Sequence, residues 1–462
     1  MKKYEKMGYW SIVLLTINSI IGSGIFISPT DVVKQAGTLT PIVYLCAAIF
    51  ASVLAISFAS ASKYVVKGGA AYAYTKAAFG EKTGFYIGIT RFVSASIAWG
   101  VMATAVVRTS LNIFKIEPTN SAITIGFLIL MLILLFINMW GTRILTVISN
   151  LSTIGKLLAL SITIIAGIVI VLKTGENHFS EIATVTGSDG SLVVPPMTVS
   201  VFVMSMLAAF YAFTGFESIA SGSQDMEKPE VNLPRAIPVG IIIIAFFYIA
   251  IVGIAMMVNP VALATSKEVV ILAAVFDNPF IKGLIIIGAL VSMFGINVAA
   301  SFHTPRVLES MAKEGQLSKF FDKRTGHDFP LRAFLLTAIV AIVVPISFDY
   351  KMGSIMVISS ISRFVQFVMV PLAVIYFYRG KSKEPILDAH KNKITDVVLP
   401  IISIILTIFL LVKFDWAGQF SETTALGTTV LNYKAITAMV FGYIVIPISL
   451  YYLKEFSQKR NA

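Results

Sequence analysis

The sequence predicts an all-α integral membrane protein with twelve transmembrane helices. Of its 462 residues, 57% are hydrophobic and only 13% are charged, which leaves too much apolar surface for a dispersed water-soluble chain. Apolar runs of at least eighteen residues, enough to cross a hydrocarbon core about 30 Å thick, recur along the whole chain. No stretch between them is long enough for a soluble domain, so we expect residues 1–462 to form a single polytopic membrane domain.

The expected spans follow one another through short connections. They cover approximately residues 9–35, 38–62, 84–112, 120–140, 144–172, 196–222, 236–258, 280–305, 331–348, 352–378, 396–413 and 435–453. Spans one to five (about 9–172) and six to ten (about 196–378) would form two halves, followed by two extra helices (about 396–453). Because five is odd, the second half would enter the membrane from the opposite side.

The formal charge of +12 falls mainly on one side of the membrane in this topology. When the N-terminus with Lys2, Lys3 and Lys6 is placed in the cytoplasm, most of the 36 Lys and Arg residues lie in inner loops and tails. This positive-inside bias predicts a cytoplasmic (cell) membrane protein with both termini inside. The charge then requires no nucleic acid partner.

Nothing in the sequence indicates catalysis or a bound cofactor. Cys46 is the only cysteine, the four histidines lie in different segments, and no GxxxxGK phosphate-binding loop occurs. We therefore expect no enzymatic activity, no metal or other cofactor, and no use of ATP as an energy source. Because outer-loop cysteines that could link a second chain are absent, we also expect no obligate partner subunit.

The first span is interrupted by small and polar residues, in the stretch TINSIIGSGIFISPT (residues 16–30). Gly22 and Gly24 lower the local stability of the helix, and unwound backbone survives in a membrane only where it lines a protein-enclosed cavity. An opened helix presents free N–H groups to a carboxylate and free carbonyls to an ammonium group. The alternative is that the small residues form a helix-packing face.

Span six carries a second interruption. Thr214, Gly215 and the acidic Glu217 lie well inside the apolar run LAAFYAFTGFESIASGSQDMEKP (residues 207–229). Spans one and six open the two expected halves, so the interruptions occupy corresponding positions. This pairing favours a transporter binding site over simple helix packing.

Five motifs occur along the chain: IIGSGIF (20–26), GGAAYAYTKAAFG (68–80), FTGFE (213–217), EKPEVNLPRAIPVGI (227–241) and SRFVQF (362–367). Together they resemble the amino acid–polyamine–organocation permeases, and the resemblance runs through all twelve spans. It implies the leucine-transporter-like fold, a 5+5 inverted repeat with broken helices one and six and two extra helices. It also implies alternating access, with amino acids or their amine derivatives as substrates.

The same resemblance implies a set of substrate-binding residues. The substrate carboxylate would lie against Ser23 and the backbone of Gly24. Its ammonium group would meet the carbonyls of Ile20, Tyr211 and Thr214, and the Tyr211 ring would close over the substrate.

Four more residues are candidates for contact or gating. Trp99, Met102 and Asn297 are candidates for the substrate side chain, although a Trp or Met within a bundle is usually a packing residue. Glu217 matches a family glutamate proposed to couple substrate contact to gating. Its alternative role is to accept hydrogen bonds from the broken helix.

Lys156 lies thirteen residues past Arg143, about 20 Å along a helix and therefore near mid-membrane. A charge there costs about 3 kcal/mol on insertion scales, so a partner or a pathway is expected. The resemblance places its ammonium group near span one, where sodium sits in sodium-coupled relatives, and implies that sodium is not required. Coupling by proton exchange and electrostatic bracing of span one both remain open.

Three other ionisable residues lie in expected spans. We expect Arg363, with Gln366 one turn away, to brace its helix, and an acidic substrate is the alternative. We expect Arg91 to reach from the inner end of span three to the membrane interface. His303, near the inner end of span eight, is expected to be a packing residue.

These observations predict a secondary active transporter of amino acids that works as an exchanger or as a proton symporter. The alternative within transport is an antiporter that exchanges an amino acid for its decarboxylated amine. A channel or a substrate sensor would be a different class. Two interrupted helices at corresponding positions favour alternating access over both.

Overall fold

The chain folds into long apolar helices, because a segment in hydrocarbon must satisfy its own backbone N–H and C=O groups. The computed structural model describes residues 6–22, 24–27, 29–186, 192–266, 270–326, 328–350, 352–414, 416–423 and 429–461. Within these ranges, nine helices are long and apolar enough to cross a membrane, and three shorter apolar helices cover Tyr9–Ile20, Leu331–Ser347 and Arg363–Tyr378. The chain is a multi-pass membrane protein.

The elements follow in chain order. The α-helices are α1 (Tyr9–Ile20), α2 (Gly24–Ile27), α3 (Pro29–Ala36), α4 (Thr40–Tyr64), α5 (Ala71–Phe79), α6 (Glu81–Ile113), α7 (Asn120–Met139), α8 (Thr142–Thr174), α9 (Val199–Tyr211), α10 (Pro229–Val258), α11 (Pro260–Thr265), α12 (Ile271–Ala274), α13 (Pro279–His303), α14 (Pro305–Lys313), α15 (Leu331–Ser347), α16 (Met352–Tyr378), α17 (Leu399–Lys413), α18 (Trp416–Gln419), α19 (Tyr433–Val440) and α20 (Ile446–Asn461). Short 3₁₀ or π segments are η1 (Gly37–Leu39), η2 (Glu181–Thr184), η3 (Phe216–Asp225), η4 (Lys319–Phe321), η5 (Ile394–Val398) and η6 (Phe441–Val445). Two three-residue strands, β1 (Ser421–Thr423) and β2 (Thr429–Leu431), pair antiparallel.

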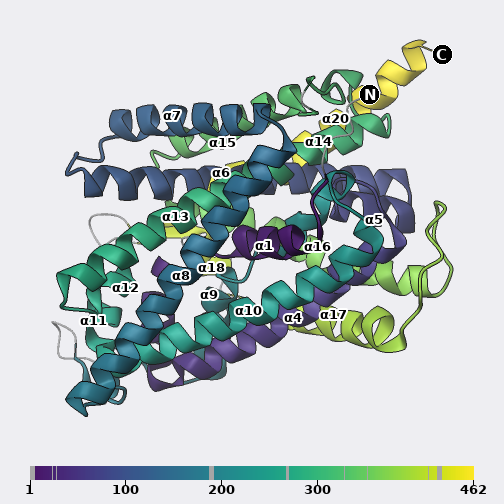
Figure 1. Ribbon diagram of the computed structural model, residues 1–462. Helices are drawn as coiled ribbons and strands as arrows, with labels where there is room; N and C mark the ends of the chain where they lie inside the picture. The colour runs from purple at the N-terminus through teal and green to yellow at the C-terminus, as the bar shows by residue number, and fades with distance from the viewer. Residues whose placement is uncertain are drawn as a thin grey trace.

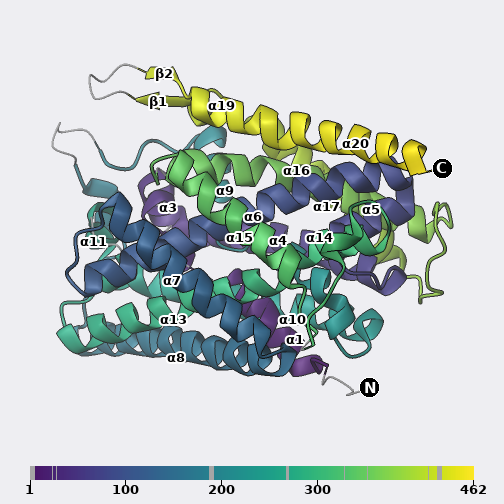
Figure 2. The ribbon, with the colours of Figure 1, turned by 90° about the horizontal axis from the view of Figure 1, so that it is seen from above.

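Helix α1 lies at the centre of the bundle. It packs against α8, α10, α13 and η3, and Figure 1 shows it beside the longer helices α8, α10 and α13. Short helices gather at the two ends of the bundle, with α11 at one end and α5 and α14 at the other (Figures 1 and 2). The α1 interruption is therefore placed deep inside the molecule.

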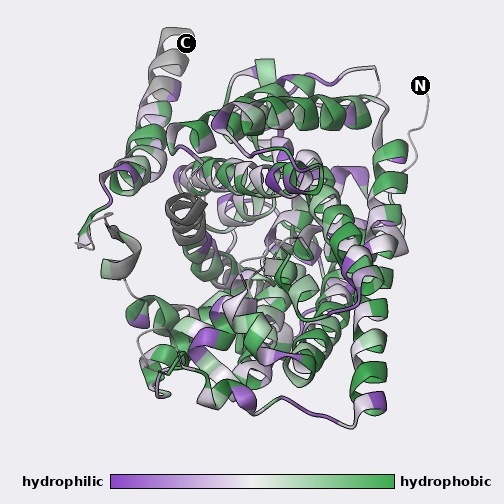
Figure 3. Cartoon of the chain, turned by 90° about the vertical axis from the view of Figure 1, so that its left-hand side faces the viewer, coloured by the Kyte–Doolittle hydropathy of each residue, from purple (hydrophilic) through white to green (hydrophobic). Residues whose placement is uncertain are grey.

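The outer surfaces of the helices are apolar. Along α8, the side chains of Leu151, Ile154, Leu158 and Ile165 are all exposed, and Figure 3 shows hydrophobic residues covering most of the helical surface. Contiguous apolar surface of this kind marks a membrane or protein contact. It fits helices that face lipid.

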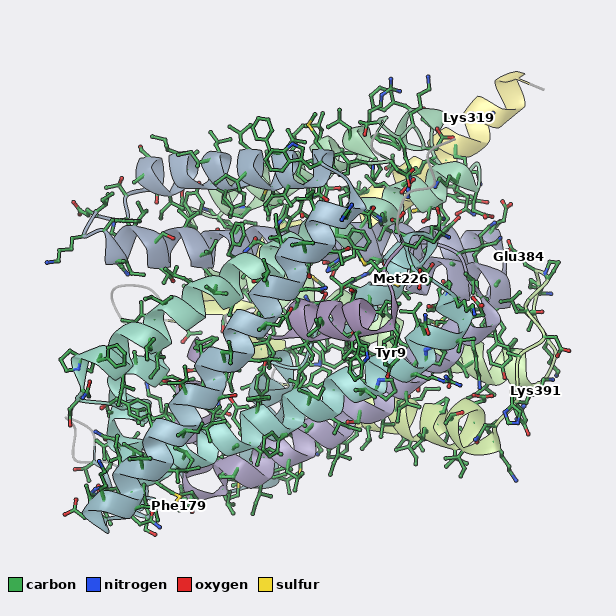
Figure 4. The ribbon with its side chains drawn as sticks, viewed as in Figure 1. Tyr9, Phe179, Met226, Lys319, Glu384 and Lys391 are labelled. Atoms are coloured by element: carbon green, nitrogen blue, oxygen red, sulfur yellow. The ribbon has the colours of Figure 1, made fainter. Side chains whose placement is uncertain are left out.

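One end of the bundle carries much of the charge. Figure 4 shows Lys319, Glu384 and Lys391 at this end, and Phe179 at the opposite end. The C-terminal part of α20 lies at the same end as Lys319 (Figure 4).

An ion-pair cluster ties three distant segments together at the charged end. Lys76 Nζ on α5 lies 2.5 Å from Glu314 and 2.8 Å from Glu384, and Lys67 lies 3.1 Å and 3.2 Å from the same two carboxylates. Burial acts to raise the pKa of Glu314, but hydrogen bonds and charge from Lys76 and Lys67 outweigh it and hold the pKa below its ordinary value. The cluster joins α5 to the segments after α14 and α16.

Candidate functional site

Two helix interruptions lie next to each other in the middle of the bundle. Helix α1 ends at Ile20, Ile21 is extended, and helical structure resumes at Gly24. Helix α9 ends at Tyr211, and η3 begins at Phe216 after Gly215, whose φ of +126° favours glycine. Ser23 lies outside the described residues.

Close backbone contact joins the two interruptions. A Cβ atom added at Gly215 would lie well inside the contact distance of the Ser19 carbonyl oxygen. One added at Gly24 would lie 3.1 Å from the Cα atom of Ala212. Only glycine at position 215 lets the backbone after α9 approach the end of α1 this closely, and a side chain at position 24 would require Ala212 to shift.

Lys156 and Ser292 satisfy the carbonyls that the α1 interruption leaves free. Lys156 Nζ donates to the Ile21 carbonyl at 2.5 Å, and Ser292 Oγ donates to the Ile21 and Gly22 carbonyls at 3.1 Å and 3.0 Å. The Lys156 side chain is fully buried, and no carboxylate among the described residues lies within ion-pair distance of it. The partial negative charge at the C-terminal end of α1 is thus the main counter-charge for its ammonium group.

A cavity with a volume of about 50 Å³ lies between the two interruptions. The interruptions supply most of its lining. The lining residues are Ser19, Ile20, Gly22, Gly24, Arg91, Ala95, Ala98, Met102, Tyr211, Ala212, Thr214, Gly215, Glu217, Ser218, Ile296, His303 and Arg363.

Most of the residues predicted from the sequence meet at this cavity. Trp99 and Asn297 are not among the residues that line it. The Trp99 ring is buried edge-on against Phe334, and Asn297 Nδ2 donates to the carbonyls of Met102 and Met293 at 3.2 Å and 2.7 Å. Asn297 therefore ties α13 to α6 beside the cavity.

Glu217 connects the second interruption to two arginines. Its Oε2 atom accepts a hydrogen bond from the Gly215 backbone N–H at 2.7 Å. Its Oε1 atom lies 3.7 Å from both Arg91 Nη1 and Arg363 Nε. One carboxylate thus caps the start of η3 and faces two guanidinium groups.

The prediction that Arg91 reaches the membrane interface is wrong. Arg91 is only 1% exposed, lines the cavity and donates to the hydroxyl of Ser218. The reason is packing: Arg91 lies on a stretch of the 33-residue helix α6 where the neighbouring residues Thr90, Phe92 and Val93 are also buried. Arg91, ten residues into the helix, is therefore deep in the bundle.

Several polar atoms at the cavity lack a partner. Ser19 Oγ, Glu217 Oε1, Arg91 Nε and Arg363 Nε are buried without a hydrogen bond to any described residue. Buried polar atoms are normally hydrogen-bonded, so such a group indicates water or a ligand. The sequence did not place Arg91 or His303 at the cavity, and it linked Arg363 to the substrate only through the alternative of an acidic substrate. One feature of the sequence could have identified them: each is an ionisable side chain within an apolar run, and such residues are functional-site candidates by default.

Tyr211 separates the central cavity from a second one. Tyr211, Thr214 and Arg363 line both, and the second is completed by aromatic and aliphatic side chains, namely Leu207, Phe210, Phe364, Phe367 and Phe414. The carbonyl of Tyr211 accepts hydrogen bonds from the Thr214 backbone N–H at 3.2 Å and hydroxyl at 2.8 Å. Tyr211 is thus fixed at the boundary between the two spaces.

Ion pairs close the bundle between the cavity and its charged end. Asp225, at the end of η3, lies 2.7 Å from Arg306 Nε and 3.0 Å from Arg324 Nη1. Met7, just before α1, pairs with Met226 through two backbone hydrogen bonds. The Met7 N–H donates to the Asp225 carbonyl, and the Met7 carbonyl accepts from the Glu227 N–H. Both interrupted helices are therefore anchored together at this end.

Sequence comparisons agree with this architecture. The family model described as "Amino acid permease" matches residues 7–446. An uncharacterized transporter of Mycobacterium tuberculosis is 38% identical over 459 residues, which cover 97% of this chain and 94% of that protein. The putrescine transporter PotE of Haemophilus influenzae is 28% identical over 71% of this chain and 73% of its own length. The human large neutral amino acids transporter small subunit 2 is 25% identical over 89% of this chain and 76% of its own length.

Proposed function

Because the chain belongs to the amino acid permease family, we propose that it is a secondary active transporter of amino acids in the cell membrane. It works by alternating access, as an exchanger or as a proton symporter. The observation that carries this proposal is the cavity between the two helix interruptions, with unpartnered polar atoms in its wall.

The proposed binding mode uses backbone groups of both interruptions. The substrate carboxylate lies against the backbone of Gly24 and against Ser23, and the substrate ammonium group lies near the carbonyls of Ile20, Tyr211 and Thr214. This mode is supported by the position of Ile20, Gly24, Tyr211 and Thr214 in the wall of one cavity. Tyr211 acts as the side chain that closes over the substrate, since it also borders the second cavity.

The proposed architecture has twelve spans, with two inverted five-helix halves and two extra helices. The nine long apolar helices and the three shorter ones support this number. The charged end of the bundle is the cytoplasmic end, which places both termini inside. No partner subunit is required in this proposal.

Lys156 replaces a bound sodium ion in the proposed mechanism. Its ammonium group donates to the Ile21 carbonyl just after α1, a position in which a cation stabilises the interruption. Glu217 couples the cavity to the second interruption through the Gly215 N–H. Proton exchange by Lys156 is the alternative role, and it applies only if the uptake experiment below identifies a symporter.

The test is uptake into proteoliposomes of the purified protein. Labelled amino acids are offered with and without internal amino acid, and with and without an inward proton gradient. Uptake that requires internal substrate identifies an exchanger, and uptake into empty vesicles that rises with the gradient identifies a symporter. Protein-free vesicles and the Gly24→Val variant, whose side chain would press on Ala212, are the controls. Uptake of no amino acid or amine by the wild type would refute the proposal.

An exchange of an amino acid for its decarboxylated amine is the second candidate function. It is favoured by the similarity to a protein named as a putrescine transporter. Vesicles loaded with putrescine or another amine test it, because only this antiporter would then accumulate the matching amino acid.

A further inference from the structure

The central cavity carries more positive than negative charge. Arg91 and Arg363 both line it, and Glu217 is the one carboxylate among its described lining residues. With Glu217 ionised, one guanidinium charge is left without a counter-charge. His303, the remaining lining residue with a basic side chain, adds to the excess when protonated and does not reduce it when neutral.

The two guanidinium groups are also incompletely bonded. Both lie 3.7 Å from Glu217 Oε1, beyond hydrogen-bond distance, and the Nε atom of each has no hydrogen-bond partner among the described residues. A buried charge is stable only when it is paired and hydrogen-bonded. The planar guanidinium fork matches the geometry of a carboxylate, the anionic group that an amino acid can carry on its side chain.

We infer that the substrate is an acidic amino acid, whose side-chain carboxylate pairs with Arg91 and Arg363. This inference rests on the proposed function, because it assigns a substrate class to the same cavity. The backbone groups of the two interruptions hold the α-amino and α-carboxyl groups, and the arginines hold the second carboxylate. A diamine or a basic amino acid would bring a further positive charge to an already positive site, so the site rejects both.

Matched substrate pairs test the inference with the wild-type protein. L-Glutamate and L-glutamine differ only in a carboxylate against an amide, and L-aspartate and L-asparagine form a second pair. A charged hydrogen bond predicts about a 10- to 100-fold preference for the acid in uptake and in competition. Equal or better transport of the amides, of L-lysine or of putrescine would overturn the inference and leave the proposed function standing. Accumulation of none of these compounds, nor of any other amino acid, would refute the proposed function itself.

The Arg363→Gln variant tests the assigned side chain. We expect its glutamate-to-glutamine uptake ratio to fall by about 10- to 100-fold. The ratio does not depend on the amount of folded protein, so it separates specificity from stability. Arg108→Gln is the matched control, because Arg108 lies on α6 outside the cavity and donates to the Tyr350 carbonyl at 3.1 Å. An unchanged ratio in Arg363→Gln would contradict the assignment, and where that variant gives no active protein the wild-type ratio decides alone.

Discussion

Replacing Gly215 by alanine should destabilise the protein strongly. Its φ of +126° is a conformation that residues with a side chain rarely adopt, which costs about 1–3 kcal/mol. The added methyl group would also press on the Ser19 carbonyl oxygen, and overpacking of this kind costs about 1–3 kcal/mol. The total of about 2–6 kcal/mol should appear as a large fall in the thermal unfolding temperature in detergent. Amino acid uptake should fall with it, because the two interruptions would have to separate.

Gly253→Ala on α10 is the matched control. Nothing lies within 4 Å of a Cβ atom at this position, and alanine favours a helix over glycine by about 0.5–1 kcal/mol. This variant should unfold at the wild-type temperature or slightly above it. If Gly215→Ala behaved like Gly253→Ala in unfolding and uptake, the proposed contact between the interruptions would be refuted.

Charged residues provide three further tests. Lys156→Met removes the cation that holds the Ile21 carbonyl, and uptake should fall at least about tenfold, since a charged hydrogen bond contributes about 1.5–3 kcal/mol. Asp225→Asn breaks a buried pair with two arginines, and its free energy of unfolding should fall by about 3–5 kcal/mol. Burial acts to raise the pKa values of Glu314 and Glu384, but the neighbouring lysines hold both below the ordinary value of 4.5. The two carboxylates thus contribute fully to stability above pH 4.5, and this contribution is lost as the pH falls through their lowered pKa values. Thermal unfolding measured between pH 7 and pH 3 would detect the loss.

Each of these three tests has its own control. Lys173→Met, at the exposed end of α8, should leave uptake unchanged, and an equal loss would mean that Lys156 acts only through helix stability. Lys434→Gln breaks an exposed pair with Asp349 and should change stability by less than about 1 kcal/mol. Lys76→Met removes the more buried of the two lysines that pair with both glutamates, so the acid dependence of unfolding should become shallower. If the pH dependence of the unfolding temperature stayed unchanged in Lys76→Met, this ion-pair cluster would not be its cause.

The sequence predicts the helices well because the membrane imposes a length requirement on each apolar run. The interruption of the first span could also be located, since Gly22, Gly24 and the polar residues around them stand out in an apolar run. The burial of Arg91 could not be predicted, because it depends on the segment that carries Ser218 packing against α6, and that contact joins residues far apart in the chain.

Contacts between distant segments were also out of reach. Lys76 and Glu384 are 308 residues apart in the chain, and nothing in the local pattern of either pairs them. Trp99 and Asn297 illustrate the same limit at the site. Each lies on a helix that contributes to the cavity, but the rotation of that helix, which decides whether a side chain faces the cavity, is set by packing against its neighbours.

The two sides of the central cavity are sealed by different kinds of force. Towards the charged end the seal is built from ion pairs, and towards the second cavity it is built from aromatic rings such as Phe210 and Phe367. Salt screens buried ion pairs such as these only weakly, whereas cooling weakens hydrophobic contacts. Low temperature should therefore favour opening past the aromatic rings, while a change in ionic strength should leave the ion-pair seal almost unchanged.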